Sequence, residues 1–160
     1  MYFWKINKLK KDITSNKFSE KDRFIYAAIY VVLSASFMEL MSLFPIEKPN
    51  IWDYIRPIAN TLIVLFGFSF AYVSNGGNNG TDFLGRFFSI GFVISIRFIV
   101  ILIPIFAALA AYYGYYYDEN EEIVSTASDN VPFLIWYTAL FWRICVHIKD
   151  VNNTLTSGID

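Results

Sequence analysis

Cysteine and histidine are nearly absent from this chain of 160 residues, which contains one of each. Cys145 has no second thiol with which to form an internal disulfide, and His147 has no cysteine or acid at metal-ligand spacing. His147 is the only imidazole that could act as a general base, and no nucleophile elbow marks a residue to pair with it in a catalytic triad. The sequence therefore predicts a protein that is not an enzyme and has no catalytic residues, metal or cofactor.

Signals for binding phosphate or nucleic acid are also weak. The glycine-rich stretch NGGNNGTDFLGR, residues 75–86, lacks the Gly-Lys-Ser/Thr ending of a phosphate-binding loop and follows an apolar run instead of a strand. We interpret it as a cytoplasmic hairpin, after which Asp82 and Arg86 are spaced to pair on a helix. The N-terminal lysines are few and interleaved with apolar residues, so no nucleic-acid partner is expected.

Apolar residues are what the chain has in excess. It is 56% hydrophobic and 19% aromatic, with a mean hydropathy of +0.42, whereas soluble domains are about 45–50% apolar. Four stretches are long enough to cross a hydrocarbon layer of about 30 Å, at residues 24–44, 54–73, 88–113 and 131–148. We predict an all-α integral membrane protein with a four-helix transmembrane domain over 23–150, a leader over 1–22 and a polar tail over 151–160.

The leader has the pattern of a short amphipathic helix. One face collects apolar residues at spacings of four, three and four, namely Tyr2, Ile6, Leu9 and Ile13. Such a helix suits the membrane surface, where lysines contact lipid headgroups; the candidates are Lys5, Lys8, Lys10 and Lys11. A solvated basic leader is the alternative. After this segment, the sequence SEKD at residues 19–22 resembles a capping box that starts a new helix.

Basic residues gather on one side of the predicted membrane. The first 23 residues contain seven lysines and arginines, whereas the 118–130 connection contains none and has five acidic residues. Basic residues near the ends of spans stay in the cytoplasm. We therefore predict a multi-pass protein of the cell inner (plasma) membrane, with both termini in the cytoplasm and the acidic connection outside.

Charged residues lie inside the predicted spans at two depths, one in the outer half and one in the inner half. A charge at the centre of a spanning helix costs about 2.5–3.5 kcal/mol, so it should face protein or water. In the outer half, Asp53, Arg56 and Asn60 form one stripe of the second span, and Glu39 on the first span has a similar depth. We expect Glu39 and Arg56 to pair, either as a structural lock between two helices or as part of a substrate or ion site.

In the inner half, Arg97 and Arg143 have no acid in their own spans at the same depth. Arg97 lies eleven residues after Arg86, or about 16 Å along a helix. Either arginine can extend to lipid phosphates or line a water-filled, positively charged cavity. Because Arg97 is deeper, we expect it to face a polar cavity or a protomer interface.

The third predicted span also carries signals for bending and close packing. Pro104 removes a backbone amide, which predicts a kink just past Arg97. Small residues spaced to let helices approach closely recur along the span; they are Gly91, Ser95, Ala107, Ala111 and Gly114.

These features lead to three hypotheses about function. The first is a homo-oligomeric, channel-like or membrane-perturbing assembly with the third span near the shared axis. The second is a binding or accessory protein that holds a membrane partner, such as an immunity protein or a subunit of a larger membrane complex. The third is a lipid- or anion-sensing protein that uses the basic leader and the inner arginines. The lipid bilayer is a partner in all three.

Overall fold

A computed structural model describes residues 2–42, 49–116 and 126–157 of the chain. These residues form helices and connecting turns, without a strand among them. In chain order the elements are α1 (Ile6–Thr14), α2 (Glu20–Ser42), α3 (Ile51–Ser74), the 3-10 turn η1 (Gly77–Asn79), α4 (Phe83–Tyr116) and α5 (Ala127–Thr156). The predicted all-α fold is confirmed for these residues.

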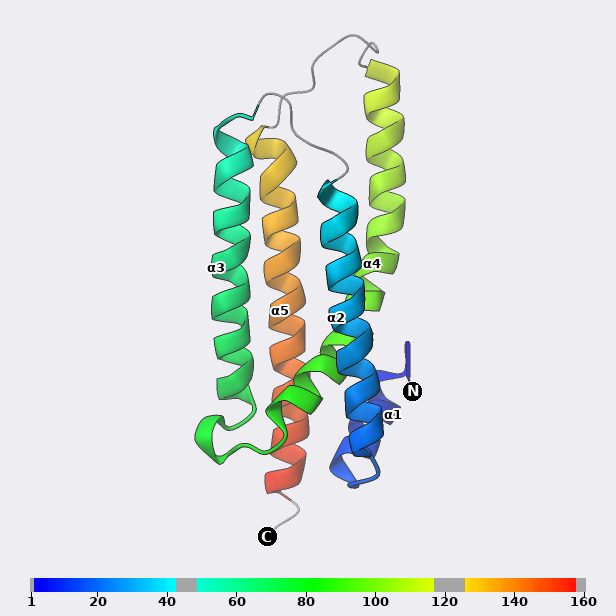
Figure 1. The fold of residues 1–160 in the computed structure, drawn as a ribbon, viewed down its shortest axis with the longest axis vertical. Helices are drawn as coiled ribbons and strands as arrows, with labels where there is room; N and C mark the ends of the chain where they lie inside the picture. Colours follow the sequence, from blue (N-terminus) through cyan, green and yellow to red (C-terminus); the bar gives the residue numbers. More distant parts are fainter. Residues whose placement is uncertain (1, 43–48, 117–125, 158–160) are drawn as a thin grey trace.

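The four long helices form two packed pairs. α3 runs beside α5, and α2 runs beside α4, while α1 packs against α4 and α5 near the end of the molecule that holds both termini (Figure 1). The first, green part of α4 runs obliquely across α5, and the helix then turns to follow the long axis (Figure 1). This oblique part links the two pairs, because it contacts α5 while α4 also packs on α2.

Three described helices are long and apolar enough to cross a membrane: Ile51–Ser74, Phe83–Tyr112 and Ala127–Thr156. They correspond to the second, third and fourth predicted spans. The first predicted span, 24–44, overlaps α2, and its last two residues lie outside the described residues, as does most of the predicted acidic connection at 118–130. The structure therefore supports a membrane protein with three candidate spans.

The helices extend beyond the predicted spans where polar residues continue a helix. α4 begins at Phe83 and α5 continues to Thr156, so much of the predicted tail at 151–160 is helical. Val151 is only 1% exposed and belongs to the core. Lys149 and Asp150 lower the local hydropathy, but they do not end the helix, because the side chains around them still pack.

Buried side chains concentrate in the half of the molecule that holds the termini. They come from α1, from the first part of α4 and from the second half of α5, with representatives Leu9, Ile90, Val93, Ile144 and Ile148, each at most 3% exposed. No residue of α2 after Tyr26, and none of α4 after Ile94, is buried among those whose exposure is described. The core therefore lies at one end of the bundle, and at the opposite ends of α2 and α4 no side chain of described exposure is buried.

Candidate functional site

Arg97, the deepest predicted arginine, contacts the N-terminal segment of its own chain. Its Nη2 donates a hydrogen bond to the carbonyl oxygen of Trp4. Its guanidinium carbon also lies 5.4 Å from the centroid of the Trp4 ring, a distance at which a cation is attracted by an aromatic face. Arg97 is only partly exposed. Within its own chain, Arg97 therefore forms an internal anchor with Trp4, and its predicted contact with a polar cavity, a protomer interface or lipid phosphate stays a prediction.

The anchor depends on how α1 is seated. The predicted amphipathic helix is present, but its apolar residues Ile6, Leu9 and Ile13 are buried against α4 and α5 instead of resting on lipid. The segment before α1 is held as well, because the Tyr26 hydroxyl donates to the carbonyl oxygen of Tyr2 at 3.0 Å. The apolar face of α1 therefore completes the core of the protein, and the position of α1 at the membrane surface stays a prediction.

The predicted headgroup lysines divide into two kinds. Lys5, Lys8 and Lys11 are exposed, and their contact with lipid remains a prediction. Lys10 instead pairs with Asp150, with 3.0 Å between Nζ and Oδ2, and its Nζ lies 3.5 Å from Nδ1 of His147. This ion pair fastens α1 to the end of α5.

A polar cluster closes the hairpin between α3 and α4. Arg86, only 3% exposed, donates to Oδ1 of Asn75 and to Oγ1 of Thr81, each at 2.8 Å. The turn is tight, because a Cβ placed on Gly80 would lie 2.0 Å from the Asn75 carbonyl oxygen. A buried arginine that is hydrogen-bonded on both Nη atoms fixes the hairpin against α4.

The predicted Asp82–Arg86 ion pair does not form. Asp82 instead forms an ion pair with Arg23 on α2, with 3.0 Å between Oδ2 and Nε. Helical spacing does not apply to Asp82, because α4 begins one residue later at Phe83. Burial raises the pKa of Asp82, and the nearby Arg23 and Arg86 charges oppose the rise.

The outer stripe is not assembled as predicted. Asp53 accepts from the backbone amide of Asn50 at 2.8 Å, so it caps the start of α3. Glu39 and Arg56 are exposed, and no ion pair joins them in the described part of the chain. The reason is topological: α3 packs chiefly on α5 and α2 on α4. Asn60 is partly exposed on the same helix.

The remaining predicted positions lie on α4 and α5. Arg143 is exposed, and α4 continues through Pro104. Gly91 is buried, and a Cβ placed there would meet Ile144 at 3.7 Å, so this small residue serves packing within the chain. The other small residues point elsewhere: Ser95 is partly exposed, and Ala107, Ala111 and Gly114 are exposed. Within residues 2–42, 49–116 and 126–157, no three His, Cys, Asp or Glu side chains gather as metal ligands.

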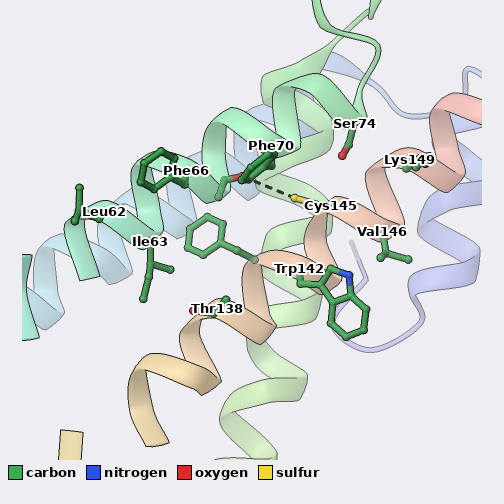
Figure 2. A pocket seen from close by; sticks show the side chains of 12 residues that line it. Leu62, Ile63, Phe66, Phe70, Ser74, Thr138, Trp142, Cys145, Val146 and Lys149 are labelled. Atoms are coloured by element: carbon green, nitrogen blue, oxygen red, sulfur yellow. Dashed lines mark hydrogen bonds between the residues drawn. The ribbon is translucent and has the colours of Figure 1, made fainter. Parts of the chain in front are cut away.

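An apolar groove lies between α3 and α5, with a volume of about 650 Å³ (Figure 2). Leu62, Phe66 and Phe70 line one side, and Trp142 lines the other. Ser74 and the carbon stem of Lys149 lie at the end opposite Leu62 (Figure 2). This groove was not predicted from the sequence, although residues 62, 66, 70 and 74 recur every fourth residue, as one helix face does.

The floor of the groove depends on a close helix approach. A Cβ placed on Gly67 would lie 2.4 Å from Cδ1 of Phe141, so only glycine fits against that ring. The thiol of Cys145 lies 3.8 Å from the Gly67 carbonyl oxygen and donates to it. Close backbone approach of this kind is how helices pack in lipid.

Comparison with known proteins identifies no relative. No protein-family model matches the chain, and no characterised protein or solved structure matches it. The function is therefore inferred from the site geometry and the placement of the helices.

Proposed function

We propose that the protein is a non-enzymatic membrane protein that associates with copies of itself through the outer half of α4. We also propose that α2 is a fourth span and that both termini are cytoplasmic. α2 has 23 residues, which extend about 35 Å. Phe24, Val31 and Met38 on it are more than half exposed. The seven basic residues among the first 23 support the orientation.

The observation that carries the proposal is the small-residue surface of outer α4, which no other described helix covers. Helices in lipid associate by close packing over small side chains, since lipid is as apolar as the helix surface. Ala107, Ala111 and Gly114 are exposed, and no described residue lies within 4 Å of a Cβ placed on Gly114. Gly91, by contrast, already packs inside the chain. The outer small residues are thus available to a second helix.

A neighbouring cleft enlarges that surface. It has a volume of about 540 Å³ and lies between α4 and α5, where Leu102, Phe106 and Ala110 face Phe133 and Trp136. Its lining is apolar apart from Ser128 and Asp129 at one end. An apolar side chain on a helix of a second copy could pack into this apolar cleft.

We do not propose that the assembly conducts ions. The channel-like hypothesis depended on Arg97 facing water, and Arg97 instead contacts Trp4. A second candidate function follows from the same surface, because the transmembrane helix of a different protein would satisfy it equally well. In that case the protein is an accessory or immunity-type subunit.

Mass measurement after extraction in mild detergent tests the proposal. We expect a discrete homo-oligomer, which Gly114→Leu converts to smaller species because the added side chain separates the helices. Val100→Leu is the matched control, since Val100 is exposed on the same helix but is not a small residue. A single copy bound to a stoichiometric partner would favour the accessory function, and a monomer in every case would contradict both.

A further inference from the structure

The α3–α5 groove has the dimensions of a site for one lipid chain. From Leu62 to Ser74 it follows twelve residues of α3, or about 18 Å. Half of a hydrocarbon core of about 30 Å is about 15 Å. The groove therefore extends over roughly one leaflet of a bilayer, and both of its walls belong to helices that are candidate spans.

The two ends of the groove differ in polarity. Along its length the walls are mainly apolar and aromatic, with Phe66, Phe70 and Trp142 prominent, and the hydroxyl of Thr138 is occupied by the Leu134 carbonyl oxygen at 2.8 Å. At the far end stands the ammonium-bearing side chain of Lys149 (Figure 2). An amphiphile with an apolar chain and an anionic head matches this order.

The charge of Lys149 is not neutralised by a neighbour. No ion pair or hydrogen bond of Lys149 occurs in the described residues, and none of the groove residues is acidic. The adjacent Asp150 is already paired with Lys10 at 3.0 Å. The groove thus ends in one free positive charge, which an anionic headgroup can satisfy and a zwitterionic one satisfies less well.

We infer that the α3–α5 groove is a binding site for an anionic phospholipid. One acyl chain lies between Phe66, Phe70 and Trp142, and the phosphate group meets Lys149. This site is separate from the association surface on outer α4. One basic residue at an anionic membrane surface contributes about 1 kcal/mol, which corresponds to about a five-fold preference for the anionic headgroup.

Tryptophan quenching by lipids with brominated acyl chains tests the inference. The full chain is placed in lipid nanodiscs that contain a small fraction of brominated phosphatidylglycerol or brominated phosphatidylcholine. The difference between the wild type and Trp142→Phe isolates the emission of Trp142 from that of the other three tryptophans. We expect half-maximal quenching of Trp142 at about five-fold less phosphatidylglycerol than phosphatidylcholine.

Two variants identify the charge responsible. Lys149→Gln should reduce the five-fold preference to about one-fold, and because Lys149 is exposed, the fold should be unaffected. Arg143→Gln is the matched control: it removes one exposed charge from the same helix, outside the groove, and should retain the preference.

Three results would overturn the inference: equal quenching by both lipids, a preference that persists in Lys149→Gln, or no quenching of Trp142 by either lipid. The last would mean that a protein helix covers the groove. Gly114→Leu separates this inference from the proposed function, because a variant that no longer self-associates should still prefer the anionic lipid.

Discussion

Replacing Arg97 by leucine should release the N-terminal segment without unfolding the spans. Arg97 contributes a charged hydrogen bond to the Trp4 carbonyl and a cation–π contact at 5.4 Å. A hydrogen bond to a charged group contributes about 1.5–3 kcal/mol, and a cation–π contact at a partly exposed site about 1 kcal/mol. Arg97→Leu should therefore favour opening of residues 2–14 by about 2.5–4 kcal/mol, or roughly a hundred- to a thousand-fold.

Amide hydrogen exchange is the assay, because it reports local opening region by region. Amides of α1 should exchange faster by that factor in Arg97→Leu, while amides of α3 and α5 keep their protection. Trp4→Ala keeps the carbonyl and loses only the ring, so α1 should exchange about five-fold faster. If the α1 amides exchange at the same rate in Arg97→Leu as in the wild type, the anchor is refuted. Contact of Arg97 with lipid phosphates or with a water-filled cavity would then be the better explanation.

Three further predictions concern the groove, the hairpin and the topology. Gly67→Ala should lower the free energy of unfolding by about 1–3 kcal/mol through overpacking against Phe141, and Phe141→Leu should restore part of it in the double variant, as thermal unfolding will show. The stabilisation from protonating Asp82 is greatest below its ordinary pKa of 3.8 and is lost as the pH rises through its raised folded-state pKa; stability measured against pH should therefore be flatter in Asp82→Asn. Cysteines introduced at 118–130 should react with an impermeant thiol reagent from outside cells, and cysteines at 76–80 should not.

A specific result would contradict each of these three predictions. Full additivity of Gly67→Ala and Phe141→Leu would mean that the two side chains do not compete for space. A pH profile that Asp82→Asn leaves unchanged would place the titrating group elsewhere. Labelling of 76–80 from outside would reverse the proposed orientation.

Local patterns in the sequence predicted the helices well. The Ile6–Leu9–Ile13 spacing identified α1 and its apolar face, and SEKD marked the start of α2, where the Ser19 hydroxyl and the Asp22 carboxylate lie 2.6 Å apart. Such signals depend on neighbouring residues only. They do not say what an apolar face packs against, which is why the burial of the α1 face against α4 and α5 was not predicted.

Contacts between residues far apart in the chain could not be predicted from the sequence. Arg97 meets a backbone carbonyl of Trp4, 93 positions away, and every residue has such a carbonyl, so no pattern marks it. Equal depth suggested that Glu39 meets Arg56, but depth does not determine which helices are neighbours. The groove differs from these two examples, because the four-residue spacing of its α3 residues is visible in the sequence. What the sequence did not reveal was that α3 packs beside α5.

Cysteine cross-linking in native membranes tests self-association through outer α4 most directly. In a Cys145→Ala background, Ala111→Cys should form a disulfide-linked dimer of the chain on mild oxidation, because the exposed small residues of two copies would face each other. Val100→Cys, on the same helix, should give much less. Equal cross-linking at both positions, or cross-linking at neither, would contradict association of copies through this surface.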